Sequence, residues 1–321
     1  MGDAEPKTGA RRPYPHGEDS SPDGAHFADS SHVCEDAAGT DLTKLAETMA
    51  EITGGEPPAT PAPLEPGDDG PGEPIIFFND VSISFNGRAV LEHVSFHVKR
   101  GQTLCILGRS GVGKSVSLRM LMGFLQPDSG SIHVEGKEIV GMSEAEMMEI
   151  RKRVTMVFQN GALFDSLSVR ENVSFPLRER GGLDEEQIYL LVDRLIGLVG
   201  AEDVVDALPA SLSTGRKRAV AMARALAAQP EVVLYDEPTT MVDPIIARRL
   251  GNLIQRLKHQ LGFTSIVVTH DMRFAERLAD EVLFLHQGRA QFFGPLKEFM
   301  ASQDPDVRQF LELDAYLLPS A

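Results

Sequence analysis

Apolar and polar residues alternate along two neighbouring stretches of the chain. These stretches read "IIFFNDVSISF" (residues 75–85) and "AVLEHVSFHV" (residues 89–98), and the dipeptide Asn86-Gly87 lies between them. Asn-Gly is favoured in tight two-residue hairpin turns because both positions need a positive φ. The pattern therefore predicts an antiparallel β-hairpin over residues 75–98.

Short, mainly apolar runs follow, separated by segments with helical periodicity. They read "TLCIL", "TMVF", "VVLY" and "SIVVT", at residues 103–107, 155–158, 232–235 and 265–269. Such runs alternating with helices predict a parallel sheet that helices cover. Between Asp165 and Leu226 the strand runs stop, and helical patterns predict an insertion. The predicted fold class is α/β: a nucleotide-binding domain over residues 75–303 with an N-terminal antiparallel β subdomain, a parallel-sheet core and a helical subdomain, then a helical extension over 304–321.

Residues 1–74 differ in composition from the rest. They contain 11 prolines, 10 glycines and few large apolar side chains, which predicts a disordered tail. They also hold 16 acidic against four basic residues, so most of the net charge of −16 lies here. Within them "DLTKLAETMAEI" (residues 41–52) places its apolar side chains on one helical face. That segment is either a helix that docks on a partner or a transient helix without a function.

Charge and composition narrow the classes of function. The nearly neutral remainder of the chain lacks the basic surface of a nucleic-acid binder. Cys34 and Cys105 suggest no disulfide framework, which favours a reducing cytosol. No apolar run approaches the ~18 residues of a membrane span, and the acidic N-terminus argues against a secretory signal or a transit peptide. We therefore expect a cytoplasmic chain that reaches a membrane only through a partner.

A phosphate-binding loop is predicted by "GRSGVGKS" (residues 108–115), which fits G-x-x-x-x-G-K-[ST] between a strand and a helix. Its glycines let backbone N–H groups face phosphate oxygens at a helix N-terminus. Lys114 is expected to reach the β- and γ-phosphates, and Ser115 to hold Mg²⁺. The predicted nucleotide-binding residues here are Gly108, Arg109, Ser110, Gly111, Val112, Gly113, Lys114, Ser115 and Val116.

Polar residues end three of the other apolar runs. Asp236 and Glu237 follow "VVLY", Gln159 closes "TMVFQ" and His270 closes "SIVVTH". Parallel sheets bind ligands at the carboxyl ends of their strands, so we expect these side chains beside the phosphate loop. Asp236 is assigned to Mg²⁺. Glu237, expected to point the other way out of the pleat, is assigned as the base for the attacking water. Taken alone, His270 is more typical of a structural hydrogen bond.

One predicted helix has an unusual first turn. In "SLSTGRKRAVAMARA" (residues 211–225), the residues Arg216, Lys217 and Arg218 crowd the helix N-terminus, where the helix dipole disfavours positive charge. From the residues alone two interpretations are open. The helix is an ordinary capped helix with solvated cations, or its N-terminus is an anion site that the cations serve.

In this order the motifs resemble those of the ATPase subunits of ABC transporters, over roughly residues 75–313. The resemblance implies a head-to-tail dimer, in which Ser213 and Gly215 of one subunit contact the γ-phosphate of ATP bound by the other. It thereby favours the anion-site interpretation. The matching features are Phe85, the Walker A motif (108–115), the Q-loop residue Gln159, a signature motif (212–216), the Walker B motif (232–236), Glu237, Asp243 in the D-loop and the switch residue His270.

The resemblance also implies roles for single residues. Phe85 would stack on adenine, and Asp243 would lie beside the nucleotide. Gln159 would sense and bind the metal, and His270 would orient the γ-phosphate. The implied cofactors are ATP and Mg²⁺, and the implied catalytic residues are Glu237, His270, Gln159 and Lys114.

Two departures from the family pattern bear on turnover. Thr214 stands in the signature where Gly is usual, and Met241-Val242 stand in the D-loop where Gly-Leu is usual. A β-branched residue costs ~1 kcal/mol or more if the position needs a positive φ or a very close approach of phosphate, but is acceptable as an ordinary first helical residue. We expect the second case for Thr214, and a working site.

Residues 158–179, "FQNGALFDSLSVRENVSFPLRE", and 304–313, "DPDVRQFLEL", are similar to segments in the ATPases of Mla and Mce lipid transporters. That branch implies phospholipid transport between envelope membranes and a location on the cytoplasmic face of the inner membrane. The implied partners are a permease (MlaE-like), an Mce-domain lipid-binding protein, a small STAS-domain subunit and a second copy of this chain. The implied permease-docking segment is 159–176, where apolar side chains either line a groove or belong to the core; these are Leu163, Phe164, Leu167 and Phe175.

Two alternatives remain at the level of sequence. The first is a soluble ABC ATPase that acts on DNA, the ribosome or cluster assembly without a permease; one nucleotide-binding domain, no long coiled-coil insertion and no basic face argue against it. The second is a regulatory module that binds nucleotide but hydrolyses little, which the departures at Thr214 and Met241 favour.

Overall fold

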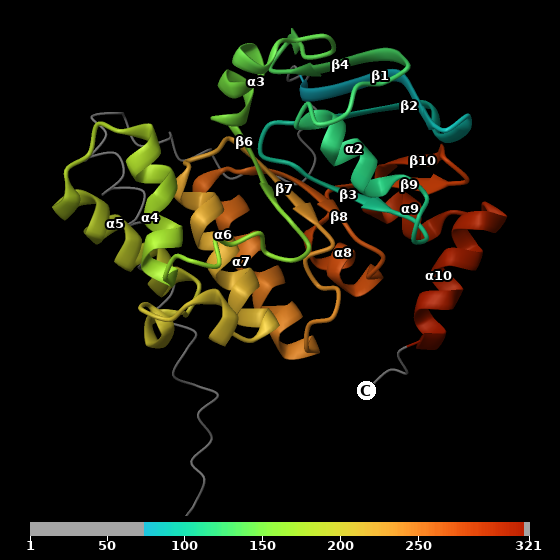
Figure 1. Ribbon diagram of the computed structural model, residues 1–321. Helices are drawn as coiled ribbons and strands as arrows, with labels where there is room; N and C mark the ends of the chain where they lie inside the picture. Colours follow the sequence, from blue (N-terminus) through green and yellow to red (C-terminus); the bar gives the residue numbers. More distant parts are fainter. Residues whose placement is uncertain (1–73, 318–321) are drawn as a thin grey trace, which may run out of the picture.

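The computed structural model describes residues 74–317, so the predictions for the tail and for the helix at 41–52 fall outside the described residues. An antiparallel sheet lies at the top of the molecule (Figure 1) and has the strand order β2-β1-β4-β5. Its strands are β1 (Pro74–Phe85), β2 (Arg88–Lys99), β4 (Ser129–Val134) and β5 (Lys137–Glu138). Asn86 and Gly87 have φ values of 51° and 73°, and Phe85 pairs with Arg88. The predicted hairpin is confirmed.

The second sheet has six strands in the order β10-β9-β3-β8-β7-β6. Neighbouring strands from β9 to β6 are parallel, and β10 is antiparallel to β9. The residues that follow β3, β8, β7 and β6 therefore meet along one edge of the sheet. The strands are β3 (Thr103–Leu107), β6 (Val154–Val157), β7 (Val232–Asp236), β8 (Thr264–Val268), β9 (Glu281–His286) and β10 (Arg289–Pro295). This arrangement confirms the predicted α/β class with its two sheets.

Helices cover the six-stranded sheet. Between β6 and β7 the chain is helical, holding α4, α5, α6 and two 3-10 turns, η1 and η2. The helices are α2 (Lys114–Leu121), α3 (Glu144–Arg151), α4 (Val169–Arg180), α5 (Glu185–Leu198), α6 (Thr214–Ala227), α7 (Pro244–Leu261), α8 (Met272–Leu278), α9 (Leu296–Ala301) and α10 (Pro305–Leu317), and the turns are η1 (Glu202–Val204) and η2 (Pro209–Ser211). Helices α3, α4 and α5 begin with capping boxes, which satisfy backbone donors at their N-termini.

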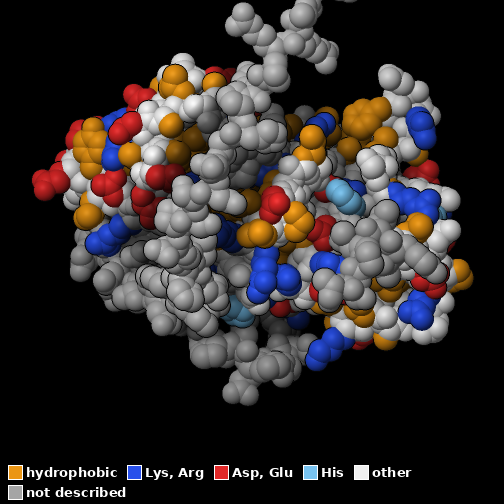
Figure 2. All heavy atoms as spheres, turned by 90° about the horizontal axis from the view of Figure 1, so that it is seen from below, with side chains coloured by type: hydrophobic (Ala, Val, Ile, Leu, Met, Phe, Trp, Pro, Cys, Tyr) orange, Lys and Arg blue, Asp and Glu red, His pale blue; other side chains and the backbone are white. Residues whose placement is uncertain are grey.

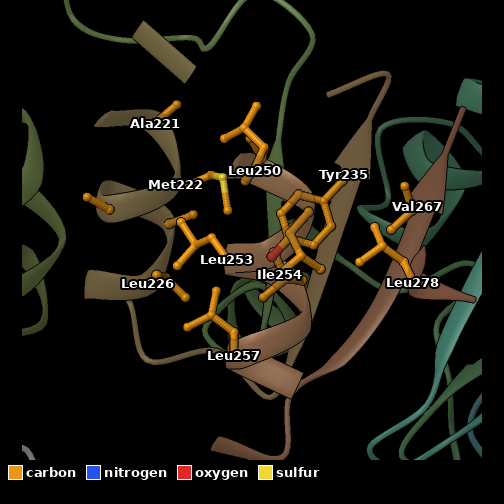
Figure 3. Close-up of a cluster of buried hydrophobic side chains, with 14 of the residues drawn as sticks. Ala221, Met222, Leu226, Tyr235, Leu250, Leu253, Ile254, Leu257, Val267 and Leu278 are labelled. Carbon is orange, nitrogen blue, oxygen red and sulfur yellow. The ribbon is translucent and has the colours of Figure 1, made fainter. Parts of the chain in front are cut away.

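Strand alternation divides the core into two clusters. In β3, Cys105 and Leu107 face the cluster under α4 to α8, while Leu104 and Ile106 face the cluster shared with α2 and the antiparallel sheet. Successive side chains of a strand point to opposite faces, so a wholly apolar strand fills both clusters. Figure 3 shows the first cluster, where leucines of α7 pack between α6 and the ring of Tyr235 in β7. No described helix is both long enough and apolar enough to cross a bilayer.

Candidate active site

The loop between β3 and α2 favours glycine at two of its positions, both for backbone conformation and for lack of space. Gly108 and Gly113 have φ values of 148° and 105°, which L-residues with a side chain rarely adopt. A Cβ on Gly113 would lie 2.6 Å from Cδ2 of Leu91, and one on Gly108 would lie 2.4 Å from the carbonyl oxygen of Leu285. The two glycines therefore let the loop approach both sheets closely.

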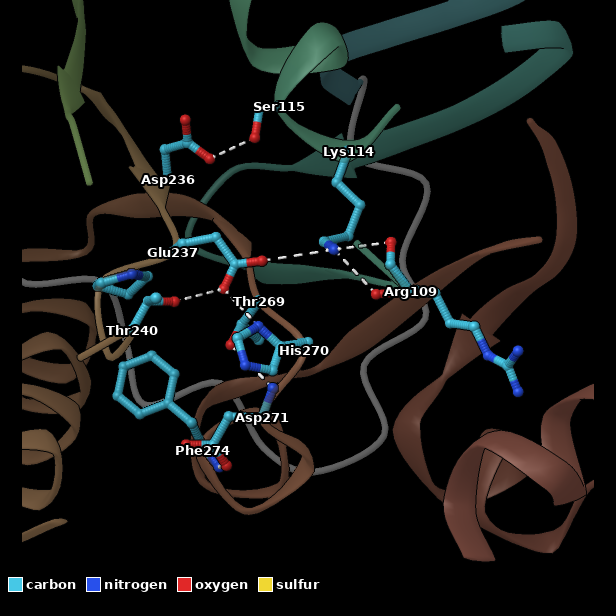
Figure 4. A network of polar contacts seen from close by, with 12 residues as sticks. Arg109, Lys114, Ser115, Asp236, Glu237, Thr240, Thr269, His270, Asp271 and Phe274 are labelled. Atoms are coloured by element: carbon cyan, nitrogen blue, oxygen red, sulfur yellow. Dashed lines mark hydrogen bonds and ion pairs between the residues drawn. The ribbon is translucent and has the colours of Figure 1, made fainter. Parts of the chain in front are cut away.

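Lys114 places its ammonium inside this loop (Figure 4). Its Nζ donates to the carbonyl oxygens of Gly108 at 2.8 Å and Arg109 at 3.2 Å, and lies 3.4 Å from Oε1 of Glu237. The side chain is 5% exposed. A buried cation held mainly by carbonyl oxygens is well placed to exchange them for the oxygens of a phosphate.

Ser115 and Asp236 join the start of α2 to the end of β7. The Ser115 hydroxyl donates to Oδ1 of Asp236 at 2.6 Å. Burial raises the pKa of the Asp236 carboxyl, while the hydrogen bond from Ser115 opposes that rise. Burial thus disfavours the charge on this carboxylate, and a bound divalent cation would stabilise it. A hydroxyl and a carboxylate at this separation are the oxygen donors that Mg²⁺ prefers, so the residues fit the metal.

Glu237 enters the site through a backbone turn rather than through strand alternation. It follows the last residue of β7 and has a φ of 48°, so the expectation that the pleat orients it is wrong. Its Oε2 accepts from the Thr240 hydroxyl at 3.0 Å and lies 2.8 Å from Nδ1 of His270. Strained backbone at a non-glycine residue is typical of functional positions. The turn and these two partners aim the carboxylate at the phosphate loop.

A cavity of about 550 Å³ brings most of the predicted residues together. Those that line it are Arg109, Ser110, Gly111, Gly113, Lys114, Ser115, Val116, Gln159, Glu237 and His270. The lining does not include Phe85, which is 41% exposed at the end of β1. It also does not include Gly108, Val112, Asp236, Ser213, Gly215 and Asp243. Within one copy of the chain, the site is a phosphate loop that faces the polar ends of β6, β7 and β8.

Sequence reasoning missed four residues of this lining: Val90, Thr240, Phe310 and Leu313. Thr240 stands in the D-loop segment three residues after Glu237, and this spacing suits a side chain that bonds back to the carboxylate. Phe310 and Leu313 lie in α10, and nothing in the local sequence indicates that the helix reaches the cavity. Their position depends on contacts between distant parts of the chain.

The signature motif begins helix α6. Ser213 is the N-cap, and its Oγ accepts from the backbone N–H of Arg216 at 3.4 Å. Thr214 is the first helical residue and is not among the residues with positive φ, so its β-branched side chain causes no backbone strain there. A Cβ on Gly215 would lie 2.9 Å from Cγ2 of Ile246. A side chain at position 215 would therefore be crowded by Ile246 of α7.

Two of the three cations in the first turn of α6 have partners within the chain. Arg216 donates to Asp203 at 2.7 Å. Arg218 is 5% exposed and donates to the backbone carbonyls of Pro238 and Thr240. Burial lowers its pKa. Within one copy of the chain Arg216 is therefore paired with a carboxylate, and Arg218 is held by two neutral carbonyl groups.

The D-loop continues from Glu237 into helix α7. Asp243 caps that helix, because its Oδ1 accepts from the N–H of Ile245 at 2.8 Å. Met241, where Gly is usual in the family, has a φ of 59° and is 90% exposed. Ile245 is 65% exposed. Asp243 therefore has a structural role within this chain, while two apolar side chains beside it face outward.

A glycine-rich phosphate loop, a buried aspartate bonded to its serine, and a glutamate–histidine pair at strand ends define a P-loop ATPase. The comparisons identify the family. Residues 91–240 match the family described as ABC transporter. The relatives described next are more than 30% identical to this chain, and the alignment covers 70% or more of the length of each. The chain belongs to the ATP-binding subunits of ABC transporters, which hydrolyse ATP and work as dimers with a membrane permease.

Curated relatives carry different transport functions. The intermembrane phospholipid transport system ATP-binding protein MlaF of Escherichia coli K12 is 36% identical over 238 residues, covering 74% of this chain and 88% of that protein. The methionine import ATP-binding protein MetN of Brucella abortus (strain 2308) is 37% identical over 270 residues, covering 84% and 70%. The chloroplastic protein TRIGALACTOSYLDIACYLGLYCEROL 3 of Arabidopsis thaliana is 39% identical over 253 residues, covering 74% and 73%.

Solved structures agree with the fold. The cbiO1 subunit of the cbiONQ ABC transporter complex from Clostridium perfringens has a TM-score of 0.66 and 31% identity, covering 76% of this chain and 98% of that one. The dimeric ATP-binding cassette MJ0796, in a post-hydrolysis state with ADP and phosphate, has a TM-score of 0.65 and 27% identity, covering 69% and 98%. The second structure supports assembly as a dimer.

Proposed function

We propose that this chain is the ATPase subunit of a transporter that moves lipid, in particular phospholipid, between envelope membranes. The observation that carries the proposal is the pair of segments 158–179 and 304–313, which are similar to the ATPases of Mla and Mce systems and lie far apart in the sequence. The first leads from β6 through the exposed loop into α4, and the second forms most of α10. Both lie outside the phosphate loop and the Walker B strand.

The comparisons support this branch over amino-acid import in one respect. Relatives with both functions match at similar identity, 36% for MlaF and 37% for MetN. The chain covers 88% of MlaF but only 70% of MetN, so almost a third of MetN lies outside the match. A second relative, from a chloroplast, has a lipid in its name. Methionine import is the alternative that the experiment below must exclude.

In the proposed mechanism the chain positions ATP and water, and stabilises charge. Lys114 exchanges the Gly108 and Arg109 carbonyls for phosphate oxygens. Glu237 accepts the proton of the attacking water. His270, 2.8 Å from Glu237, holds that carboxylate in place and turns toward the γ-phosphate when it is present. Gln159 lines the same cavity from the end of β6, where it can orient the water.

The metal would be held at the junction of α2 and β7. Ser115 and Asp236 would provide its protein oxygens, with Gln159 nearby. When bound, Mg²⁺ would neutralise charge that develops on the β- and γ-phosphates. Asp236 is then the residue that must be ionised for the site to bind the metal.

The second active-site half would come from another copy of this chain. Ser213 is exposed and does not line the chain's own cavity. The exposed Met241 and Ile245 lie at the D-loop, where a facing subunit would cover them. In a head-to-tail dimer Ser213 and the Gly215 N–H would contact the γ-phosphate bound by the other copy. Asp243 would lie at the same interface.

The proposed permease-docking surface is the aromatic pair Phe164 and Phe175. They are 39% and 38% exposed, and their ring centroids are 4.9 Å apart. The guanidinium carbon of Arg224 lies 4.3 Å from the Phe164 centroid, and its Nη1 donates to the carbonyl of Ala162 at 2.6 Å. Leu163 instead packs against the core. An ordered aromatic platform with a half-covered cation suits the end of a short helix of the permease.

The alternative of a soluble ATPase that acts on nucleic acid finds little support. On the face seen in Figure 2, Lys and Arg side chains of the described residues are scattered among acidic and apolar ones rather than gathered in one field.

We propose a location on the cytoplasmic face of the inner membrane, bound through a permease. An Mce-domain protein and a STAS-domain subunit would complete the complex.

The test is to tag the full chain in its native cell, solubilise membranes in mild detergent and identify the proteins that co-purify without ATP. Recovery of a multi-span permease together with an Mce-domain protein supports the proposal. Recovery of a permease with a periplasmic amino-acid-binding protein would replace lipid by amino-acid transport. Recovery from the soluble fraction alone would refute the transporter function, while the ATPase class would stand.

A further inference from the structure

Helix α10 is anchored over the end of strand β9. The Asp304 carboxylate accepts from the N–H groups of Asp306 at 2.9 Å and Val307 at 3.1 Å, and from the side chain of Gln291 in β10 at 2.9 Å. Val307 is fully buried, and the ring of Phe310 packs 5.0 Å from that of Phe284 in β9. Cap and apolar contacts together fix where the helix begins and which face it turns inward.

That inward face reaches the ATP cavity. Phe310 and Leu313 line the same cavity as Lys114 and Glu237, although they lie almost 200 residues beyond the phosphate loop. Phe310 is 8% exposed and Leu313 is 45% exposed. Figure 1 shows α10 at the right of the molecule, on the β9–β10 side of the sheet. The helix thus adds an apolar surface to a site that is otherwise built from loops and strand ends.

Sheet topology places this surface opposite the hydrolytic residues. In the strand order, β9 lies on one side of β3, whereas β8, β7 and β6 lie on the other. His270, Glu237 and Gln159 follow those three strands. Val90, which also lines the cavity, lies on the β9 side, because a Cβ on Gly288 in the β9–β10 turn would be 2.7 Å from its carbonyl oxygen. The apolar end of the cavity is therefore formed by Val90, Phe310 and Leu313.

We propose that α10 forms a wall for the nucleoside of the bound nucleotide, and that nucleotide binding and the seating of α10 stabilise each other. With its γ-phosphate toward Glu237 and its other phosphates on the loop, a nucleoside triphosphate directs its ribose and base toward Val90, Phe310 and Leu313. The partly exposed Leu313 has apolar surface that a base would cover. This inference rests on the proposed orientation of ATP in the cavity, and it names a contact outside the phosphate loop and the strand ends.

The test compares Leu313→Ala with Gln309→Ala in the full chain. Gln309 is exposed on the same helix and does not line the cavity. The dissociation constants of ADP and of inorganic pyrophosphate are measured by titration calorimetry. Loss of the apolar contact should raise the Kd of ADP about three- to tenfold in Leu313→Ala. Pyrophosphate has no nucleoside, so its Kd should not change, and Gln309→Ala should match the wild type for both.

Hydrogen exchange of the wild-type chain tests whether nucleotide binding stabilises α10. ADP should slow the exchange of backbone amides in α10, whereas pyrophosphate should not, because a ligand stabilises the elements that it contacts. An unchanged Kd for ADP in Leu313→Ala overturns the inference, and so does an equal rise for both ligands, which would indicate a general disturbance of the site. A wild-type chain that binds neither ligand would instead contradict the nucleotide binding on which the proposed function depends.

Discussion

Oε2 of Glu237 lies 2.8 Å from Nδ1 of His270, although the two residues are 33 positions apart in the sequence. The glutamate follows β7 and the histidine follows β8, which are neighbouring parallel strands. The glutamate side chain is 13% exposed and the histidine side chain 56% exposed. The pair therefore joins an enclosed carboxylate to an imidazole that solvent or a ligand can reach, the arrangement that suits a base and its orienting partner.

Replacing Glu237 by Gln should remove the base and keep the shape of the site. We expect ATP hydrolysis to fall roughly 10²- to 10⁴-fold, the usual contribution of such a group, and an ATP-bound dimer to accumulate. Phosphate release and light scattering with ATP measure the two effects. Glu276→Gln, an exposed change on α8, serves as the control. Wild-type turnover in Glu237→Gln would show that the base is another group.

Asp236→Asn tests the raised pKa of that carboxyl. A carboxyl whose pKa is raised on folding binds its proton more tightly in the folded state, so ionisation costs stability. Below its unfolded value of 3.8, both states are protonated and the variant should match the wild type. As pH rises, the nucleotide-free variant should become the more stable of the two. Thermal melting from about pH 3 to 8 without Mg²⁺ measures this, and a difference that shrinks with rising pH would contradict it.

Arg218→Ala should weaken the link between α6 and the D-loop. The change leaves the buried carbonyl of Pro238 and the partly buried carbonyl of Thr240 without their donor, which costs about 1–3 kcal/mol of unfolding free energy. Urea denaturation measures the loss, and Arg218→Lys should recover part of it. Lys217→Ala in the same turn should change stability by less than about 0.5 kcal/mol. Equal effects at the two positions would show that the hydrogen bonds of Arg218 to these carbonyls do not stabilise the fold.

Gly113→Ala and Gly111→Ala separate crowding from backbone strain. Both glycines have positive φ, 105° and 81°, so each substitution costs about 1–2 kcal/mol through backbone conformation. The new Cβ would lie 2.6 Å from Leu91 at Gly113, but in open space at Gly111. Overpacking should add about 1–3 kcal/mol at Gly113 alone. Denaturation midpoints compare them, and an equal loss would show that Leu91 moves aside freely.

Phe175→Ser tests the proposed docking surface. The residue is 38% exposed, so the isolated chain should keep its fold and its affinity for ATP. The amount of chain recovered with the membrane fraction should fall several-fold, because aromatic anchors at an interface contribute about 2 kcal/mol or more. Met148→Ser, at an exposed residue of α3, is the matched control. Full recovery of the Phe175 variant with membranes would place the docking surface elsewhere.

Features that depend on local backbone conformation and on periodicity could be predicted from the sequence alone. Asn86-Gly87 predicts its own hairpin because both residues accept a positive φ. The apolar runs predict the parallel strands, since a strand buried on both faces has no polar alternation. The phosphate loop and the carboxylates after "VVLY" could be located because each motif is contiguous, and parallel strands bring their carboxyl ends together.

Contacts between distant segments could not be predicted in this way. A left-handed turn, rather than the pleat, aims Glu237 at Lys114. Arg218 turns inward to carbonyls of the D-loop, and α10 brings Phe310 and Leu313 to the ATP cavity. None of these contacts has a local signature, because each depends on packing between elements that folding alone brings together. Periodicity shows which side chains are buried, whereas the shape of the whole core selects the segment that each one contacts.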